Sequence, residues 1–337
     1  MSSGSTSQRR VRLALERFAV AGVFRTSRDE KREVEVVCCE IEQGSATGRG
    51  EGAPLRRYGQ SPEGELAAAR TVLRALEHGM DRTALGAALG PGPARNAIDC
   101  ALWDLEAKST GRPAWQLAGL APPAPIVTAF TVSLDEPAAM AAAAGAHAEL
   151  PLLKVKLGRE GGREGVCERV RTVRAAAPRA RLVVDANEAW TAELYASVAP
   201  ELAALGVELC EQPLPAADDA ALAGLAHPVP VCADESCHDR SSLAALAGRY
   251  EAVNVKLDKA GGLTAALALA AAARAAGFEL MVGSMVSSSL AIAPALLVAA
   301  QARWADLDGA LWLARDRPAG MRAQAGRLGP APSALWG

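Results

Sequence analysis

Charged residues close a series of short apolar runs in the second half of the chain, and this series constrains the fold more than any other feature. The runs end at Lys156, Asp185, Glu211, Asp234 and Lys256, with helical sequence between them. Strands that alternate with helices predict a parallel sheet. In a closed (β/α) barrel the carboxyl ends of all strands meet at one rim, where such barrels keep their functional groups.

Apolar stretches of strand length occur eight times in this region, and alanine-rich segments with helical character separate them. The candidate strands cover residues 126–133, 152–157, 182–185, 207–211, 229–233, 252–256, 279–282 and 303–307. Eight strands permit closure into a barrel, but the span is short against the roughly 250 residues of a typical one. We therefore expect short loops and a second element that covers the open rim.

The first third of the chain has a different pattern, typical of an α+β unit. We expect two paired strands, at residues 11–20 and 33–41. The glycines that follow are expected to mark turns and a loop that runs to Ser61. Those glycines are at positions 44, 48, 50 and 52. Helices are expected at 62–78 and 93–108, where apolar residues recur at helical spacing.

The chain is therefore expected to have an α/β fold with three parts. Residues 1–120 should form an α+β capping domain, residues 121–310 the barrel with the active site, and residues 311–337 a segment that packs back on the capping domain. Asp99 and Asp104 lie on the second predicted helix, far from the strand ends. We expect these two acids to cap, pair or face solvent rather than to act chemically.

Composition excludes several classes of protein. The net charge is only −2, without the basic stripe that nucleic-acid binding needs. The apolar runs fall short of the roughly 18 uncharged residues of a membrane helix. The seven cysteines form no CxxC pair, and charges at Glu16 and Arg17 argue against a signal peptide. A reduced, cytoplasmic protein is the expectation.

Three acids at successive strand ends, Asp185, Glu211 and Asp234, are the candidates for a metal site. Hard oxygen ligands suit Mg²⁺ or Mn²⁺, and one carboxylate from each of three neighbouring strands leaves coordination positions for substrate and water. The alternative is that each acid ends its strand by chance or pairs with a nearby arginine.

Lysines flank these acids on both sides. Lys154 and Lys156 alternate with apolar residues, so they share one face of a strand. Inside a barrel they would repel each other and lower each other's pKa, whereas on an edge strand they would be solvated. Lys259 follows the sixth strand, roughly across the barrel from Lys156. Two amine bases beside a metal could remove a proton from one face of a carbon and return it to the other.

Five segments carry a resemblance to a known family. They are Lys-Val-Lys at 154–156, Val-Asp-Ala-Asn-Glu at 184–188, Glu-Gln-Pro-Leu at 211–214, Ala-Asp-Glu-Ser at 233–236 and Lys-Leu-Asp-Lys-Ala-Gly-Gly at 256–262. With them the chain resembles the enolase superfamily, muconate-lactonising-enzyme subgroup, and within it the dipeptide epimerases acting on L-Ala-D/L-Glu. The resemblance implies a (β/α)₇β barrel under an α+β cap, Mg²⁺ on the three acids, and Lys156 and Lys259 as the acid/base catalysts.

An Asp-x-Asp at the end of the last strand, Asp306 and Asp308, narrows the resemblance. In dipeptide epimerases this motif binds the free α-ammonium of the substrate, which two carboxylates can hold by charge-assisted hydrogen bonds. Two solvated acids at a strand end are the alternative. Further expected substrate contacts are Lys154, Thr131, Ser284 and Met285. Supporting roles beside the metal are expected for Asn187, Glu235 and Lys256.

The capping domain should supply a cation for a side-chain carboxylate on the second residue of the substrate. The loop before its second strand offers four basic residues, Arg25, Arg28, Lys31 and Arg32. Lys31 falls where Ala-Glu epimerases often place a basic residue, although such a loop could simply be solvated. Tyr58 is a second candidate contact from the cap.

The sequence thus predicts an Mg²⁺-assisted isomerase that epimerises the C-terminal residue of a dipeptide, with L-Ala-D/L-Glu from cell-wall peptides as the favoured substrate. By analogy with its relatives it is expected to form homo-oligomers. Other reactions of the subgroup remain open: muconate cycloisomerisation, o-succinylbenzoate synthesis and racemisation of N-acylamino acids. Asp306 and Asp308 disfavour these anionic or acylated substrates. A non-catalytic binding protein is disfavoured because all three acids and both lysines are present.

Overall fold

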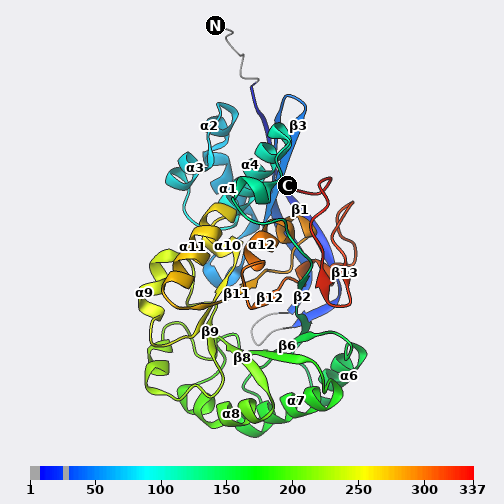
Figure 1. Ribbon diagram of the computed structural model, residues 1–337, viewed down its shortest axis with the longest axis vertical. Coiled ribbons are helices and arrows are strands. Elements are labelled where there is room, and N and C mark those ends of the chain that lie inside the picture. Colours follow the sequence, from blue (N-terminus) through cyan, green and yellow to red (C-terminus); the bar gives the residue numbers. More distant parts are fainter. Residues whose placement is uncertain (1–7, 26–29) are drawn as a thin grey trace.

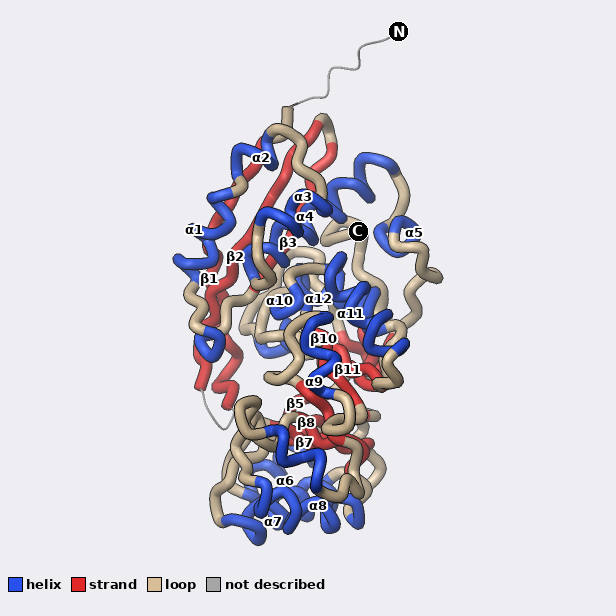
Figure 2. The backbone as a smooth tube through the Cα atoms, turned by 90° about the vertical axis from the view of Figure 1, so that its left-hand side faces the viewer, coloured by secondary structure: helices blue, strands red, loops and turns tan. Residues whose placement is uncertain are grey.

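The computed structural model describes residues 8–25 and 30–337. Its two main parts are an antiparallel sheet packed against helices and a parallel barrel surrounded by helices (Figure 1). In a view turned by 90°, strands β1 and β2 run along one side of the molecule down to the level of the barrel strands (Figure 2). The predicted barrel with an N-terminal α+β unit is confirmed. Among the described residues, no helix has the length and apolar character needed to cross a membrane.

The N-terminal sheet contains three antiparallel strands in the order β1-β2-β3. They are β1 (Arg10–Arg25), β2 (Glu30–Gln43) and β3 (Ala46–Gly52). The central strand β2 is buried on both faces. Val37 and Ile41 pack against the helices of this unit, while Val36 and Cys38 pack with Met285 from the barrel. The sheet therefore connects the helices to the mouth of the barrel.

Strand β3 corrects the prediction of a loop after residue 44. Its glycines at 48, 50 and 52 alternate along the strand and so face the same side. A Cβ at each would lie 2.1 Å from a carbonyl oxygen of helix α4. The three oxygens belong to Ala101, Ala97 and Pro93, one helical turn apart. These glycines permit close packing of a strand on a helix, which is why a reading of glycine as a turn signal failed.

Helix α4 agrees with the helix predicted at 93–108, beginning at Pro93 and ending before Gly111, whose φ is 68°. The helix predicted at 62–78 is instead divided at Val72, and α3 was missed. The helices of this part are η1 (Arg56–Tyr58), α1 (Pro62–Thr71), α2 (Leu73–Glu77), α3 (Arg82–Ala88), α4 (Pro93–Thr110) and α5 (Ala114–Leu117).

The barrel contains eight parallel strands in chain order. They are β5 (Phe130–Val132), β6 (Leu152–Lys156), β7 (Arg181–Asp185), β8 (Val207–Glu211), β9 (Val231–Ala233), β10 (Ala252–Val255), β11 (Glu279–Gly283) and β12 (Trp304–Asp306). The first and last strands meet where Ala129 N–H donates to the Ala305 carbonyl at 2.8 Å. Each of the eight predicted strands has a counterpart, although of the first only residues 130–132 belong to the barrel and residues 126–127 pair in another sheet. The carboxyl ends of the eight strands meet at one rim.

The helices outside the barrel depart from the prediction in one crossover. Between β8 and β9 the helical element is the 3₁₀ helix η2 (Asp219–Gly224) instead of an α-helix. The helical elements after β5 are α6 (Pro137–Ala146), α7 (Gly162–Ala176), α8 (Ala192–Ala204), η2 (Asp219–Gly224), η3 (Arg240–Ser242), α9 (Leu243–Leu246), α10 (Leu257–Ala260), α11 (Leu263–Ala275), α12 (Ser289–Ala299) and η4 (Gly309–Trp312).

The C-terminal segment returns to the N-terminal part. Strands β13 (Ala323–Gln324) and β14 (Arg327–Leu328) form a small antiparallel sheet with β4 (Ile126–Val127). Trp336 donates its indole N–H to the Cys100 carbonyl in α4 at 3.0 Å. The chain end therefore lies beside the helix that also packs on β3.

Candidate active site

Side chains inside the barrel change from apolar to charged toward the rim. One cluster fills the interior with an apolar layer: Ala129, Leu152, Val183, Leu209, Cys232, Ala252, Met281 and Trp304. Two residues further along a strand, the side chain again points inward. These positions hold Thr131, Lys154, Asp185, Glu211, Asp234, Asn254, Gly283 and Asp306. The period of two residues thus brings the predicted groups together above an apolar floor.

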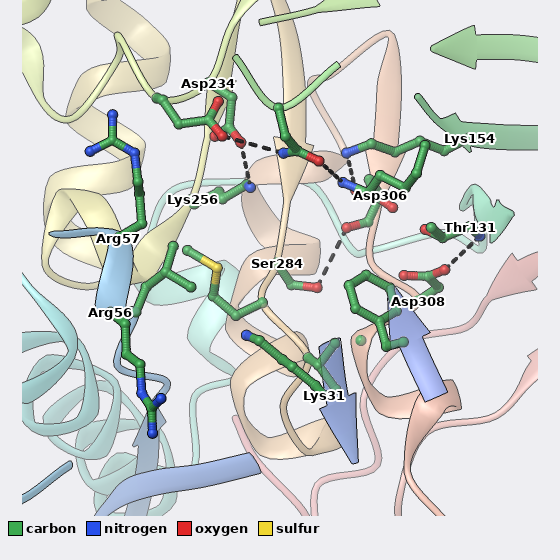
Figure 3. Close-up of a pocket in the computed structure, with 18 of the residues that line it drawn as sticks. Lys31, Arg56, Arg57, Thr131, Lys154, Asp234, Lys256, Ser284, Asp306 and Asp308 are labelled. Atoms are coloured by element: carbon green, nitrogen blue, oxygen red, sulfur yellow. Dashed lines mark hydrogen bonds and ion pairs between the residues drawn. The ribbon is translucent and has the colours of Figure 1, made fainter. Parts of the chain in front are cut away.

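A cavity of about 610 Å³ opens at this rim, between the barrel and the N-terminal unit. The predicted substrate contacts all line it: Lys31, Thr131, Lys154, Ser284, Met285, Asp306 and Asp308. So do Lys156, Asn187, Asp234, Glu235 and Lys256. Figure 3 shows Lys154, Thr131, Asp306 and Asp308 on one side of the cavity and Asp234, Lys256 and the cap arginines on the other.

The three predicted metal ligands lie at the ends of the adjacent strands β7 and β8 and just after β9, and all are buried. Lys154 Nζ lies 2.9 Å from Asp185 Oδ2 and 2.6 Å from Glu211 Oε2. Asp234 instead pairs with Lys256 at 2.7 Å. Each carboxylate is therefore balanced by an ammonium group within the barrel.

Lys154 is surrounded by negative charge, because its ammonium also lies 2.7 Å from Asp306 Oδ2. Burial lowers the pKa of Lys154, but the neighbouring carboxylates raise it more, so it stays well above its usual value. The expectation that Lys154 and Lys156 would lower each other's pKa is therefore wrong for Lys154. Its positive charge is fixed by three acids.

Lys156 reaches into the cavity from the end of β6. Its Nζ donates to Asp185 Oδ2 at 2.6 Å and to Asn187 Oδ1 at 3.1 Å. Asn187 has φ 44°, in the left-handed region, and its backbone N–H donates to Asp185 Oδ1 at 2.9 Å. The turn after β7 thus orients both the acid and the lysine.

Lys259 lies on the opposite wall, because β6 and β10 are four strands apart in an eight-stranded barrel. It belongs to α10, a single turn directly after β10, and it is buried. Its Nζ donates to Asp234 Oδ1 at 2.7 Å and to the Asn254 carbonyl at 3.2 Å. The two lysines thus contact carboxylates at opposite ends of the row of acids.

The acid row has the chemistry of a hard-cation site. Within residues 8–25 and 30–337, no three histidine, cysteine, aspartate or glutamate side chains form a ready ligand cluster, since ammonium groups lie against the acids. Yet the buried Oε2 atoms of Glu211 and Glu235 accept no hydrogen bond. Lys154 Nζ lies close to Glu211 Oε2, but the angles between them are not those of a hydrogen bond. Burial raises the pKa of Glu211 to about 7 and of Glu235 to about 8. Oxygen donors with spare lone pairs suit Mg²⁺ or Mn²⁺.

The acid pair of the last strand shares the same cavity. Asp306 Oδ1 is buried and accepts no hydrogen bond, while Asp308 Oδ2 accepts from the Thr131 backbone N–H at 2.7 Å. Burial and the nearby Asp306 raise the pKa of Asp308 to about 6. Two carboxylates this close, one with an unfilled acceptor, favour a cationic partner.

Of the basic residues predicted for the cap loop, Lys31 lies at the cavity, but it belongs to β2, as Arg32 does, and Arg25 ends β1. Arg25 and Arg32 instead pair with Glu30 at 3.1 and 3.0 Å. Arg28 lies outside the described residues. Tyr58 also lines the cavity, with its ring edge-on to His238 at 4.8 Å between centroids.

Sequence reasoning missed several supporting residues. Asn254 donates to Glu211 Oε1 at 2.7 Å, and its place in the period of two residues could have revealed it. Trp312 donates to Asp308 Oδ2 at 3.2 Å. Arg57 binds Glu188 through two hydrogen bonds of 2.8 and 2.9 Å, which ties the cap to the turn after β7. Because Arg57 and Glu188 are far apart in the sequence, no local sequence pattern could have revealed their contact.

Comparison with protein families agrees with this geometry. Residues 9–119 match the mandelate racemase / muconate lactonizing enzyme N-terminal domain, and residues 136–320 match the enolase C-terminal domain-like family. The chain belongs to the enolase superfamily. The resemblance drawn from its strand-end segments is confirmed.

Two curated relatives of this superfamily member have related activities. It is 46% identical over 322 residues to the L-Ala-D/L-Glu epimerase of Escherichia coli (strain K12), covering 95% of this chain and 99% of that protein. It is 42% identical over 292 residues to the N-acetyl-D-glutamate racemase of Pseudoalteromonas sp, covering 86% and 91%.

Two solved structures show ligands on the same fold. An enolase family member from Agrobacterium tumefaciens with homology to dipeptide epimerases was crystallised with sodium and L-Ala-L-Glu. Its TM-score is 0.93 at 47% identity, covering 98% of this chain and 100% of that one. A dipeptide epimerase from Enterococcus faecalis V583, complexed with Mg and L-Leu-L-Tyr, has a TM-score of 0.87 at 28% identity, covering 96% and 97%.

Proposed function

We propose that this superfamily member is an isomerase that epimerises dipeptides at the α carbon of the C-terminal residue, with L-Ala-D/L-Glu as the favoured substrate. The observation that carries the proposal is the buried acid pair Asp306/Asp308 at a cavity that Lys156 lines, with Lys259 buried against Asp234 on the opposite side of the barrel. The activity of the Escherichia coli relative, at 46% identity, supports the same substrate.

The two lysines divide the proton transfer between the faces of the α carbon. In one direction Lys156 removes the α proton and Lys259 protonates the other face, and in the reverse direction the roles exchange. Asp185, Glu211 and Asp234 would hold Mg²⁺, or Mn²⁺ in its place. When bound, the cation supplies positive charge that stabilises the negative charge developing on the substrate carboxylate.

The remaining residues of the cavity fix the ends of the substrate. Asp306 and Asp308 bind its ammonium group, and Lys31 binds the side-chain carboxylate of the second residue. Contacts from Thr131, Lys154, Ser284 and Met285 shape the site between them. Asn187, Glu235 and Lys256 support the acids and Lys156 through the contacts described above.

Racemisation of an N-acylated glutamate is the second candidate, because a relative at 42% identity has an activity of that kind. An acyl group removes the ammonium that the acid pair would bind. The buried Asp306 Oδ1 would then stay without a hydrogen-bond donor, and a buried acceptor left unpaired costs about 1–3 kcal/mol. We therefore favour a substrate with a free amino group.

The cellular setting follows from the same proposal. Recycling of cell-wall peptides would place the enzyme in the cytoplasm, and the seven cysteines are all buried free thiols. We further propose that it forms homo-oligomers and that residues 1–120, 121–310 and 311–337 are its capping domain, barrel and C-terminal segment.

Proton NMR in D₂O tests the function. With Mg²⁺ and L-Ala-L-Glu, the Glu α-proton signal should disappear while the second diastereomer forms. N-acetyl-L-glutamate should react much more slowly. Faster reaction of the acetylated compound would reject the role of Asp306 and Asp308. Exchange of other dipeptides such as L-Ala-L-Leu, but not of L-Ala-L-Glu, would reject the role of Lys31.

A further inference from the structure

The short helix that carries Lys259 is held at both ends by the capping helix α4. Helix α10 contains only four residues, Leu257–Ala260, and Lys259 is the third of them. A single isolated turn has little stability of its own, because nucleating a helix costs more than one turn returns. The position of the Lys259 ammonium therefore depends on the groups that bind the backbone and side chains around it.

On the side before Lys259, the contact runs through Asp258. Its carboxylate is buried, and Oδ1 accepts from Asn96 Nδ2 at 2.8 Å and from the Ala53 backbone N–H at 2.9 Å. Asn96 lies on α4, and Ala53 directly follows β3. Two elements of the cap thus converge on the residue next to Lys259.

On the side after Lys259, the contact runs through Arg95 of α4. Its guanidinium donates to the Gly261 carbonyl at 2.9 Å and also to the Ala260 carbonyl. Gly261 has φ 86°, and a Cβ there would lie 2.3 Å from Arg95 Nε. Glycine therefore suits the left-handed backbone after α10 and leaves room for the arginine in its present position.

A third contact from α4 fixes the following helix. Asp99 accepts from the backbone N–H of Thr264 at 2.9 Å and from its hydroxyl at 2.7 Å. A Cβ on Gly262 would lie 2.5 Å from Asp99 Cβ. The expectation that Asp99 caps or pairs is thereby met: its carboxylate caps the start of α11, which leaves α10 little freedom to shift.

We propose that Arg95 and Asn96 are positioning residues for Lys259, so that the capping helix sets the reactivity of one of the two bases. The inference rests on the proposed function. Arg95 and Asn96 do not line the cavity and bind α10 or the glycine after it, so they act through the position of α10. Proton transfer needs the amine within hydrogen-bond reach of the α carbon, and a shift of about 1 Å can cost about a hundredfold in rate.

The test is the α-proton exchange of L-Ala-L-Glu and L-Ala-D-Glu in D₂O, each followed by NMR from its initial rate. Lys259→Ala first identifies the epimer whose proton Lys259 removes. Asn96→Ala and the less buried Arg95→Gln should slow exchange of that epimer by about tenfold to a hundredfold. Lys156 removes the α proton of the other epimer, and the exchange rate of that epimer should change by less than about threefold.

Two control variants separate positioning from general destabilisation. Asp104→Asn changes another buried acid of α4, one that binds Arg49 N–H and Gly337 N–H rather than α10, and should leave the ratio of the two rates unchanged. Asp258→Asn keeps an Oδ1 acceptor for Asn96 and should also keep the ratio. Equal slowing of both epimers by Asn96→Ala and Arg95→Gln would overturn the inference. A wild-type enzyme that exchanges neither dipeptide would overturn the proposed function itself.

Discussion

The two walls of the active site are held by contacts of different kinds. The Lys156 wall depends on the turn after β7, where Glu188 has φ 65° and pairs with Arg57, whose side chain is 40% exposed. The Lys259 wall depends on hydrogen bonds between α4 and α10, with Asn96 and Asp258 buried. The Glu188 side chain is buried, so only the arginine side of this ion pair is open to screening by salt, whereas the buried hydrogen-bond network is not screened. The cap therefore fixes one base and holds the other more loosely.

The largest effect should come from removing either lysine. Lys156→Ala and Lys259→Ala should each reduce epimerisation by about a thousandfold or more, since a general base typically contributes about 10²–10⁴-fold. Each variant should still exchange the α proton of one epimer, and the surviving epimer should differ between them. NMR in D₂O measures this directly. Full two-way activity in either variant would refute the two-base scheme.

A change at the acid pair should affect both walls equally. Asp306→Asn weakens a charge-assisted contact with the substrate ammonium, which is far from the reacting face, so kcat/KM should fall by about tenfold to a hundredfold for both epimers. Steady-state kinetics on each epimer tests this. A loss confined to one epimer would mean that Asp306 acts on a lysine, for instance through Lys154, rather than on the ammonium.

A smaller effect is expected from the ion pair of the Lys156 wall. Arg57→Gln should slow exchange of the epimer served by Lys156 by about threefold to tenfold, because the guanidinium is partly exposed and Glu188 keeps its contact with the Ala216 backbone N–H. Adding salt to the wild-type enzyme should slow the same epimer selectively. Arg49→Gln, a change at a cap arginine that pairs with Glu40 and does not line the cavity, serves as the control. Slowing of both epimers alike would place Arg57 in substrate binding instead.

The smallest effect concerns Asp258, next to Lys259, and how its carboxyl makes the stability of the protein depend on pH. Burial raises the pKa of Asp258 to about 7; the facing Glu51 adds to this, and the hydrogen bonds from Ala53 and Asn96, with Lys256, oppose it. The folded state therefore keeps this proton as the unfolded chain loses it above about pH 4. This carboxyl's contribution to stability is complete below about pH 4 and is lost as pH rises toward 7.

Asp258→Asn removes that dependence. The variant should gain stability relative to wild type as pH rises from 4 to 7, and the difference should level off above 7, with a shift of a few degrees in Tm. Thermal unfolding followed by circular dichroism at several pH values measures it. Asp104→Asn provides the comparison with another buried acid on the cap side. A difference that shrinks as pH rises would contradict the raised pKa.

The barrel and its charged rim could be predicted because both follow from local periodicity. Lys154 lies within an apolar strand, while Asp185, Glu211 and Asp234 lie at or just after the ends of theirs, and alternation alone places all four inside. The cap was harder to predict. The glycines of β3 mark contact with α4 rather than turns, and a glycine needed for a close approach looks in sequence like one needed for a turn.

Contacts between the cap and the barrel could not be predicted at all. Asn96 and Asp258 are 162 positions apart, and Arg57 and Glu188 are 131 apart. No periodicity relates residues on separate domains, so their pairing depends on how the domains dock. The prediction of a lowered pKa for Lys154 failed for a similar reason, because its three acidic neighbours come from β7, β8 and β12.

The most direct test of the difference between the walls compares Arg57→Gln with Asn96→Ala in one experiment. The quantity is the ratio of the initial α-proton exchange rates of L-Ala-L-Glu and L-Ala-D-Glu in D₂O with Mg²⁺. Relative to wild type, the two variants should shift this ratio in opposite directions, Asn96→Ala in the same direction as Lys259→Ala. A shift in the same direction for both, or none, would contradict the claim that the cap holds each base separately.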